Sequence, residues 1–477
     1  MITNPFTALD WSAVWPLLVV AATALVVLFA DLIIAGALKR PISIAISIAG
    51  ILVAGYLCAR TYGQSYSAFG GGFIVGGFAV VFQELILLAA LFSVALYAAI
   101  GESEYLAGSL ALLLWSTSGA MLMAGAGNLI TIFLGLELLS LALYCLCGMS
   151  NRRIARESAL KYLILSSTAT GVMLYGMALF FGASGSVSLA ALAAPNVASS
   201  PLFVIGCGLF LIGLAFKLSL VPFHVWTPDV YEGAPLPVTA FMSVATKAGA
   251  LAVLARFTYA VISAPQAHAI LYPIWIIAGL SMLVGNLAAL AQTDIKRLLA
   301  YSGIAQVGYV VAALAGSTTL GLRYAIFYLA AYLFMNLGAF AVVALLSTQD
   351  EEGSRIAAYH GLARRRPILA AMMTFFLLSL AGFPPTAGFI GKILILSSLV
   401  SARYAWLAGV LILGTAISLY VYFKLIRLMY ERQEPKLVVG VNSRAPLAWL
   451  SVAVCAVATL GLTLYPLTPS NVLPLVK

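Results

Sequence analysis

Long apolar runs alternate with short polar segments along almost the whole of this chain. A helix that crosses a bilayer needs about 20 apolar residues, so the pattern predicts about fourteen crossing segments. They run over roughly 13–37, 41–60, 78–100, 105–124, 127–149, 158–182, 201–231, 236–262, 269–291, 297–316, 321–347, 367–400, 403–430 and 445–466. We therefore predict an all-α polytopic membrane protein in which residues 1–477 form a single membrane domain.

The composition supports this prediction and excludes several kinds of site. Of the 477 residues, 63% are hydrophobic and 8% are charged, whereas a soluble domain carries about 25% charged residues. The five cysteines lie in apolar stretches and form no C-x-x-C pair. No glycine-rich phosphate loop follows a strand. We therefore expect no metal, redox or nucleotide site in this chain.

The net charge of +10 indicates topology rather than nucleic-acid binding, because the basic residues gather in alternate short loops. These loops contain Lys39 and Arg40; Arg152, Arg153 and Arg156; Lys296 and Arg297; Arg364, Arg365 and Arg366; and Arg432, Lys436 and Arg444. The positive-inside rule places them in the cytoplasm. Both termini are then expected on the outer side, which agrees with an even number of helices.

Two of the predicted helices are interrupted by proline. The seventh is broken around Pro222 and the twelfth around Pro384 and Pro385, five helices later. A unit of five helices is odd, so its repeat enters the membrane from the opposite side. We predict two inverted five-helix repeats, residues 105–262 (helices 4–8) and 269–430 (helices 9–13). Broken helices at matching positions of such repeats indicate a transport site.

Four ionisable side chains lie deep within the predicted helices: Glu137, Lys217, Lys247 and Lys392. A charge at such a depth costs about 2.5–3.5 kcal/mol or more, and it usually marks a proton or ion route. Lysines near helix ends can extend to the lipid headgroups, but Lys217 and Lys247 lie near the membrane middle by counting. We predict that these four residues carry protons.

The first break is expected to act on Lys217 directly. Pro222 has no amide hydrogen, so it should free the carbonyl of Leu218 and open a small hydrated pocket beside the lysine. His224 either extends this proton route or serves as a hinge that donates to a backbone carbonyl. Glu137 has the opposite charge to Lys217, and the two form either a switchable pair or a static ion pair between helices.

The second break is expected to act on Lys392 through a helix end. A new helical segment should start near Gly388, which places Lys392 about one turn from its N-terminus. That end of a helix carries partial positive charge and disfavours a cation.

Five longer motifs resemble a known family. They are "GLELLSLALY", "ALKYLILSSTATGVMLYGMALFFGASGS", "GLAFKLSLVPFHVWTPDVYEGAPLPVTAF", "QTDIKRLLAYSGIAQVGY" and "LSLAGFPPTAGFIGK". Together they resemble the subunit N family of proton-translocating NADH–quinone oxidoreductase (respiratory complex I), whose antiporter-like fold is shared with multisubunit sodium/proton antiporters. The likeness covers nearly the whole chain. The family's key residues match Glu137, Lys217, Lys247 and Lys392 here.

The resemblance implies a proton-translocating subunit that couples quinone reduction elsewhere to proton transfer. It implies no cofactor in this chain, with NADH, FMN, Fe–S clusters and quinone bound by partner subunits. The implied partners are lipid and the other membrane-arm subunits of complex I, and the implied location is the bacterial cytoplasmic (inner) membrane.

The chain also departs from the family in places. Gln306 stands where many relatives have histidine, Gly76 replaces a usual aspartate, and Glu84 in the third helix is unexpected. Two other functions stay open: a subunit of a multisubunit sodium/proton antiporter, and a subunit of a membrane-bound hydrogenase complex. A purely structural scaffold does not account for lysines kept within lipid.

Overall fold

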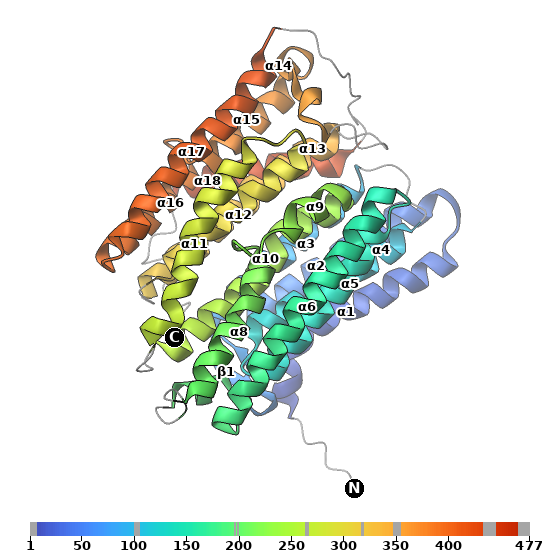
Figure 1. Ribbon diagram of the computed structural model, residues 1–477. Helices are drawn as coiled ribbons and strands as arrows, with labels where there is room; N and C mark the ends of the chain where they lie inside the picture. Colours follow the sequence, from blue (N-terminus) through green and yellow to red (C-terminus); the bar gives the residue numbers. More distant parts are fainter. Residues whose placement is uncertain are drawn as a thin grey trace.

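A computed structural model describes residues 7–99, 105–194, 197, 200–262, 267–315, 319–346, 354–432 and 445–465. Its long helices lie roughly side by side, as Figure 1 shows. The α-helices are α1 (Ala8–Ile33), α2 (Lys39–Arg60), α3 (Gly77–Tyr97), α4 (Leu106–Gly125), α5 (Leu129–Gly148), α6 (Arg153–Ser184), α8 (Pro201–Leu218), α9 (Trp226–Gly233), α10 (Leu236–Val261), α11 (Ala267–Ala289), α12 (Ile295–Ala313), α13 (Thr319–Leu346), α14 (Leu362–Arg365), α15 (Pro367–Ala381), α16 (Ala387–Ser401), α17 (Ala405–Tyr430) and α18 (Pro446–Leu464). Short 3-10 helices are η1 (Gly36–Leu38), η2 (Phe69–Gly71), η3 (Leu189–Ala193) and η5 (Ile356–Tyr359).

The all-α membrane architecture predicted from the apolar runs is confirmed. Among the described residues, 12 helices are long and apolar enough to cross a bilayer. The other two predicted segments correspond to α12 and to the shorter pair α15 and α16. Each predicted proline break separates two helices, α8 from α9 and α15 from α16. The charged start of α6 is helical as well, so this helix begins five residues before the predicted 158.

The sequence did not predict a small hairpin between α2 and α3. Strand β1 (Tyr66–Ala68) pairs antiparallel with β2 (Phe73–Val75). Gly70 and Gly71 take φ values of 63° and 88°, a left-handed conformation that glycine adopts without a steric penalty. This explains why the turn of the hairpin is rich in glycine.

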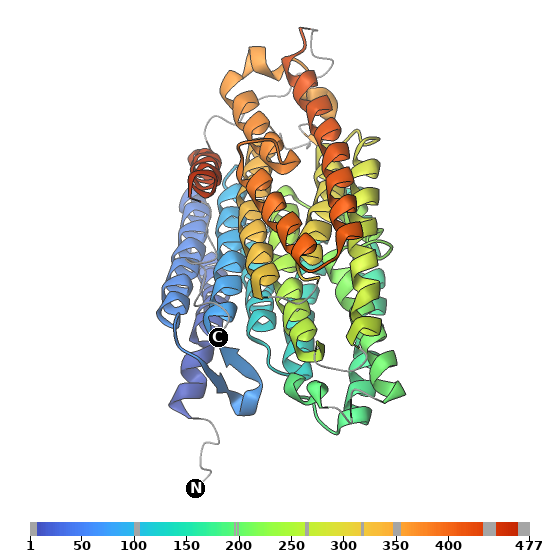
Figure 2. The same cartoon turned by 90° about the vertical axis from the view of Figure 1, so that its left-hand side faces the viewer.

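The helices of the two predicted repeats lie on opposite sides of the molecule. In Figure 1, α4 to α10 (cyan to green) occupy one side and α11 to α17 (yellow to orange) the other. The N-terminal helices α1 to α3 pack outside the first group, where α1 contacts α4 and α3 contacts α10. Helix α18 contacts α3 and α13, and Figure 2 shows it beside the blue N-terminal helices. The two ends of the chain therefore cover the same flank.

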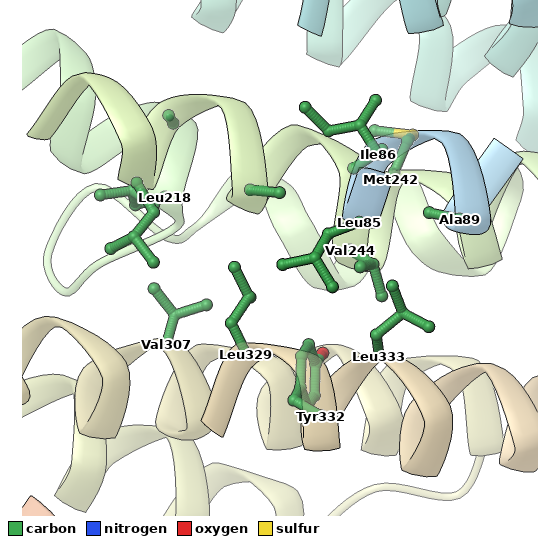
Figure 3. Close-up of a cluster of buried hydrophobic side chains, with 14 of the residues drawn as sticks. Leu85, Ile86, Ala89, Leu218, Met242, Val244, Val307, Leu329, Tyr332 and Leu333 are labelled. Atoms are coloured by element: carbon green, nitrogen blue, oxygen red, sulfur yellow. The ribbon is translucent and has the colours of Figure 1, made fainter. Parts of the chain in front are cut away.

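The core lies where α3, α10 and α13 meet. Figure 3 shows Leu85 of α3 and Val244 of α10 facing Leu329 and Leu333 of α13. Every residue in the most apolar window of α10 is buried within the protein. In addition, Nδ2 of Asn336 on α13 donates to Oγ of Ser243 on α10 at 2.6 Å. Helix α10 is thus enclosed by protein rather than by lipid.

Some sequence predictions fall on residues that the structure does not describe. The basic residues Lys436 and Arg444 lie outside the described residues. The predicted outward placement of the two termini falls on residues 1–6 and 466–477, which also lie outside them.

Candidate functional site

Two buried lysines lie at the first broken helix, one on the helix itself and one on the neighbouring α10. Helix α8 ends at Leu218 because Ser219 adopts a left-handed conformation (φ 60°, ψ 36°), and α9 begins at Trp226. Lys217 is 1% exposed and Lys247 of α10 is 2% exposed. Neither amine therefore reaches the lipid headgroups, which excludes the alternative in which these lysines extend to the membrane surface.

The amine of Lys217 is held by side-chain hydroxyls. Its Nζ donates to Oγ of Ser140 on α5 at 2.8 Å and to the hydroxyl of Tyr162 on α6 at 3.0 Å. It also lies 5.3 Å from the centre of the Tyr162 ring, within the range of a cation–π interaction. Three helices therefore meet at this one amine.

The amine of Lys247 occupies the end of α8. Its Nζ donates to the backbone carbonyl of Lys217 at 3.3 Å and also to Oγ of Ser219. The Trp226 ring lies 5.2 Å from this nitrogen. The last carbonyls of a helix have no intrahelical partner and carry partial negative charge, so this position suits a cation.

The structure changes the expected picture around Pro222. Pro222 itself is exposed rather than beside the lysine. The carbonyl of Lys217 accepts from Lys247, and the carbonyl of Phe216 accepts from the Trp226 indole at 3.1 Å. Side chains of the protein therefore satisfy these two carbonyls at the break, and the hydrated pocket expected beside the Leu218 carbonyl stays a prediction.

His224 lies in the segment between α8 and α9 and is half-buried. Its Nδ1 is buried and has no hydrogen-bond partner among the described residues. The ring packs edge-on against Tyr301, with 6.4 Å between ring centres. Both roles expected of His224, proton route and hinge, stay predictions.

Glu137 is not joined to Lys217 by an ion pair. It is half-buried on α5, one turn before Ser140, and Ser140 takes the place beside the amine. Among the described residues, Glu137 forms neither an ion pair nor a hydrogen bond with the protein, although it is near enough to act on Lys217 electrostatically. A direct pair would require α5 or the Lys217 side chain to move.

The second broken helix places one buried lysine at its break. Helix α15 ends at Ala381 because Gly382 takes a φ of 81°, and Pro384 and Pro385 follow. Thr386 then caps α16, its hydroxyl accepting from the backbone N–H of Phe389 at 3.4 Å.

Lys392 points back across this break. It is 3% exposed, and its Nζ donates to the carbonyls of Leu380 at 3.2 Å and Ala381 at 2.9 Å. The Tyr309 ring lies 4.7 Å from the amine. The ammonium therefore contacts the negative, carbonyl end of α15, not the positive end of α16 expected from the sequence. The long side chain reverses the expected electrostatic environment.

Gln306 of α12 lies at the same carbonyl. Its Nε2 donates to the carbonyl of Leu380 at 3.0 Å, and its Oε1 accepts from the Tyr328 hydroxyl. An amide neither gains nor loses a proton near neutral pH, so Gln306 acts here as a fixed hydrogen-bonding group.

An ion-pair cluster lies at the far end of α9. The Nη1 atom of Arg297 contacts Asp229 and Glu232 at 2.7 Å each, and Lys161 contacts Asp229 at 3.1 Å. Partial burial raises the pKa of the Asp229 carboxyl, but hydrogen bonds from Arg297 and Lys161 outweigh it and lower the pKa below its ordinary value. This cluster joins α9 to α6 and α12.

The sequence identified the lysines but missed the groups that hold them. Ser140, Tyr162 and Ser219 are the hydroxyl acceptors of the first break. Their one signal was position: Ser140 lies one turn after Glu137, and Ser219 directly follows the end of α8. Among the described residues, no group of three or more His, Cys, Asp or Glu side chains is arranged to hold a metal ion.

Comparisons with known proteins give consistent results. Residues 126–418 match the family described as "NADH:quinone oxidoreductase/Mrp antiporter, TM". The chain is 40% identical to NADH-quinone oxidoreductase subunit N 1 of Symbiobacterium thermophilum, over 98% of each chain. It is 34% identical to a chain of respiratory complex I from Thermus thermophilus, with a TM-score of 0.82, over 95% of this chain and 98% of that one. A chain of the Mrp complex from Dietzia sp. is 21% identical, with a TM-score of 0.84 over 98% and 96% of the two chains, which shows a shared fold alone.

Proposed function

Because this chain belongs to the NADH:quinone oxidoreductase/Mrp antiporter membrane family, we propose that it is a proton-translocating subunit of the membrane arm of a NADH–quinone oxidoreductase. The support is a likeness that spans almost the full length of both chains. In this function, quinone reduction in other subunits drives proton transfer through Glu137, Lys217, Lys247 and Lys392. The chain contributes to a translocase and carries out no redox chemistry itself.

The observation that carries the proposal is the joined pair of buried amines at the first break. The amine of Lys247 donates to the backbone carbonyl of Lys217, and both lysines are surrounded by hydroxyls. A hydroxyl both donates and accepts, so it can pass a proton on, whereas a carbonyl only accepts. Ser140, Tyr162 and Ser219 therefore supply steps by which a proton can reach or leave the lysines.

The second helix break forms the other half of the proposed proton route. Residues 105–262 and 269–430 act as the two inverted repeats, each containing one broken helix. In both, a lysine amine contacts the carbonyl end of the first half of that helix. Broken helices with this arrangement serve as ion sites in transporters. Lys392 is then the proton carrier of the second repeat.

Several residues around the breaks serve as path or hinge. Pro222, Pro384 and Pro385 hold the helices broken, because proline cannot continue the helical hydrogen-bond pattern. His224 lies on the connection that must flex if α9 moves. Gln306 fixes the carbonyl that Lys392 also uses.

The partners and surroundings follow from the same family. NADH, FMN, Fe–S clusters and quinone are bound by partner subunits, and the neighbours in the membrane are lipid and other membrane-arm subunits. The chain lies in the bacterial cytoplasmic (inner) membrane with both termini on the outer side, as its basic loops favour.

Subunits of sodium/proton antiporters or membrane-bound hydrogenases have a related function. The identity of 40% with a NADH-quinone oxidoreductase subunit favours the first assignment.

The test replaces the lysines in the assembled complex. Lys217→Ala and Lys247→Ala should each lower proton pumping in membrane vesicles by about tenfold or more, because each removes charged hydrogen bonds of about 1.5–3 kcal/mol. Quinone reduction should slow as well, since the two processes are coupled. The matched control is Lys424→Ala, a more exposed lysine that donates to the carbonyl of Leu290 at 3.0 Å.

Two experimental outcomes would contradict parts of the proposed function. Full pumping in both lysine variants would refute the assignment of these residues. Purification without any NADH-oxidising subunit would instead favour the antiporter function, whatever the lysine variants do.

A further inference from the structure

One acidic side chain lies in the membrane far from the lysines and is unused by the proposed mechanism. Among the described residues, Glu84 and Glu137 are the acidic side chains that form no ion pair and accept no N–H or O–H hydrogen bond from the protein. By contrast, Asp31 pairs with Lys39 at 3.0 Å and Glu157 pairs with Lys161 at 2.9 Å. Glu84 therefore needs an explanation of its own.

Glu84 lies on α3 against a glycine of α2. It is seven residues into its helix, which corresponds to about 10 Å below the helix end at 1.5 Å per residue. A Cβ atom built on Gly55 would lie 3.4 Å from Oε2 of Glu84, so the carboxyl rests directly on the α2 backbone. Its Oε1 is buried and has no hydrogen-bond partner in the described part of the chain. The thiol of Cys58 lies beside the carboxyl of Glu84, within reach of a weak S–H hydrogen bond, and also donates to Oε1 of Gln83 at 3.1 Å.

An apolar groove runs beside this carboxyl. It lies between α2 and α3, has a volume of about 300 Å³ and is walled by residues such as Leu88 and Leu91. Its rim is formed by Leu52 and Tyr56, which are 57% and 64% exposed. Helix α2 lies at one edge of the protein (blue in Figure 2), and the exposed Leu52 and Tyr56 side chains place the opening of the groove on that edge. Small apolar molecules can therefore enter it from the lipid.

We propose that Glu84 is a proton-binding carboxyl reached from the lipid, and that it is the site at which apolar carbodiimides modify this flank of the protein. The site is separate from the buried lysines and does not depend on the proposed function. Its ligands are a proton and a small apolar electrophile that dissolves in the bilayer. An ionised carboxylate would lack any cation or N–H donor in this groove, so the carboxyl is held with its proton.

The reaction balances without another reagent. The acid adds across one C=N bond of the carbodiimide: a carboxyl oxygen bonds to the central carbon, and the proton moves to a nitrogen. The resulting O-acylisourea rearranges when the acyl group migrates to nitrogen, which gives a stable N-acylurea. In water the first adduct would be hydrolysed. The apolar walls at Leu88 and Leu91 exclude water and so favour the stable product.

The test labels the intact complex in native membranes with dicyclohexylcarbodiimide and locates the adduct by peptide mass spectrometry. Glu84 should be modified, and Glu84→Gln should remove the adduct from α3 while leaving pumping unchanged. Gly55→Leu should lower the modified fraction at Glu84 about fivefold, because its side chain fills the groove. A water-soluble cationic carbodiimide should instead modify Glu157, whose side chain is 56% exposed, and spare Glu84.

Three results would overturn the proposal. The first is that Glu84 stays unmodified by the apolar reagent in the intact complex, because a partner helix or a tightly held lipid covers the groove. The second is that the water-soluble reagent modifies Glu84 as readily as Glu157, because the groove contains water. The third is that Gly55→Leu leaves labelling at Glu84 unchanged although the complex assembles normally, because the groove is not the route of access.

Discussion

The two helix breaks hold their lysines in different ways. At the first break, Lys217 and Lys247 donate mainly to hydroxyls, those of Ser140, Tyr162 and Ser219. At the second, Lys392 donates to two backbone carbonyls at the end of α15. Hydroxyl groups can rotate and relay a proton, whereas backbone carbonyls are fixed and only accept. In the proposed function, the first break is therefore suited to relay protons, and the second holds the amine of its proton carrier, Lys392, against fixed acceptors.

The helices that carry the lysines at the two breaks also differ in how much protein surrounds them. Lys247 lies on α10, which is enclosed by protein along its length. Lys392 lies on α16, where the next residue, Ile393, is 45% exposed. The first broken helix thus lies at a central position in the protein, and the second lies at a more peripheral one. The two predicted repeats therefore differ in the chemistry around each amine.

The largest expected effect comes from disturbing the fixed geometry of the second break. A Cβ atom at Gly388 would lie 1.8 Å from the backbone oxygen of Ser379, which cannot move aside as a side chain can. Gly388→Ala should therefore cost about 3 kcal/mol or more and strongly reduce the amount of assembled subunit. Immunoblotting of purified membranes measures this. Gly409→Ala, where a Cβ meets open space, is the control. Normal assembly of Gly388→Ala would show that the second break is as adaptable as the first.

A smaller effect is expected from removing one hydroxyl at the first break. Tyr162→Phe takes away an acceptor of Lys217 but keeps the ring that stacks on Trp226 at 4.7 Å between centres. A hydrogen bond to a charged group is worth about 1.5–3 kcal/mol, so pumping should slow by about tenfold or more while assembly stays normal. Tyr175→Phe, an exposed tyrosine on the same helix, is the control. Unchanged pumping by Tyr162→Phe would end the distinction between relay hydroxyls and fixed carbonyls.

The smallest effect is expected at the ion-pair cluster of α9. This prediction tests whether surface charge accounts for the difference between the two helix breaks. Lys161→Ala removes two half-exposed ion pairs, with Asp229 and Glu157, each worth at most about 1 kcal/mol, and Arg297 still holds Asp229. The midpoint of thermal unfolding should fall by only a few degrees. Because the pKa of Asp229 is lowered in the fold, its contribution is present at neutral pH and is lost only as the pH falls below the ordinary value of 3.8. A large loss of proton pumping in Lys161→Ala would mean that the ion-pair cluster, not the buried amines, distinguishes the first break from the second.

The helices were predictable because lipid imposes a simple rule. A crossing segment must be long, apolar and internally hydrogen-bonded, so α10 was predicted at 236–262 and is found at Leu236–Val261. The breaks were predictable because an interior proline removes a backbone hydrogen bond and favours a kink or an end of the helix, although Pro16 and Pro273 lie within α1 and α11. The β1–β2 hairpin was missed, because its strands are only three residues long and carry too little pattern to detect.

The site was only half predictable, for a physical reason. A lysine in an apolar run is conspicuous because its charge is costly there. A serine is not conspicuous, since many bond within their own helix, as Ser93 does with the carbonyl of Ala89. Apart from its position one turn after Glu137, nothing local distinguishes Ser140, which accepts from Lys217. The surroundings of Lys392 were mistaken because the position of its Cα does not fix where a long side chain places its amine.

The burial of α10 has a consequence for how the subunit is made. The ribosome produces α10 before α13, the helix that covers one of its sides and donates from Asn336 to Ser243. Until α13 has been synthesised and inserted, a helix shaped for enclosure must face lipid or the insertion machinery. Nascent chains that stall before Thr319 therefore leave this side of α10 without its protein neighbour.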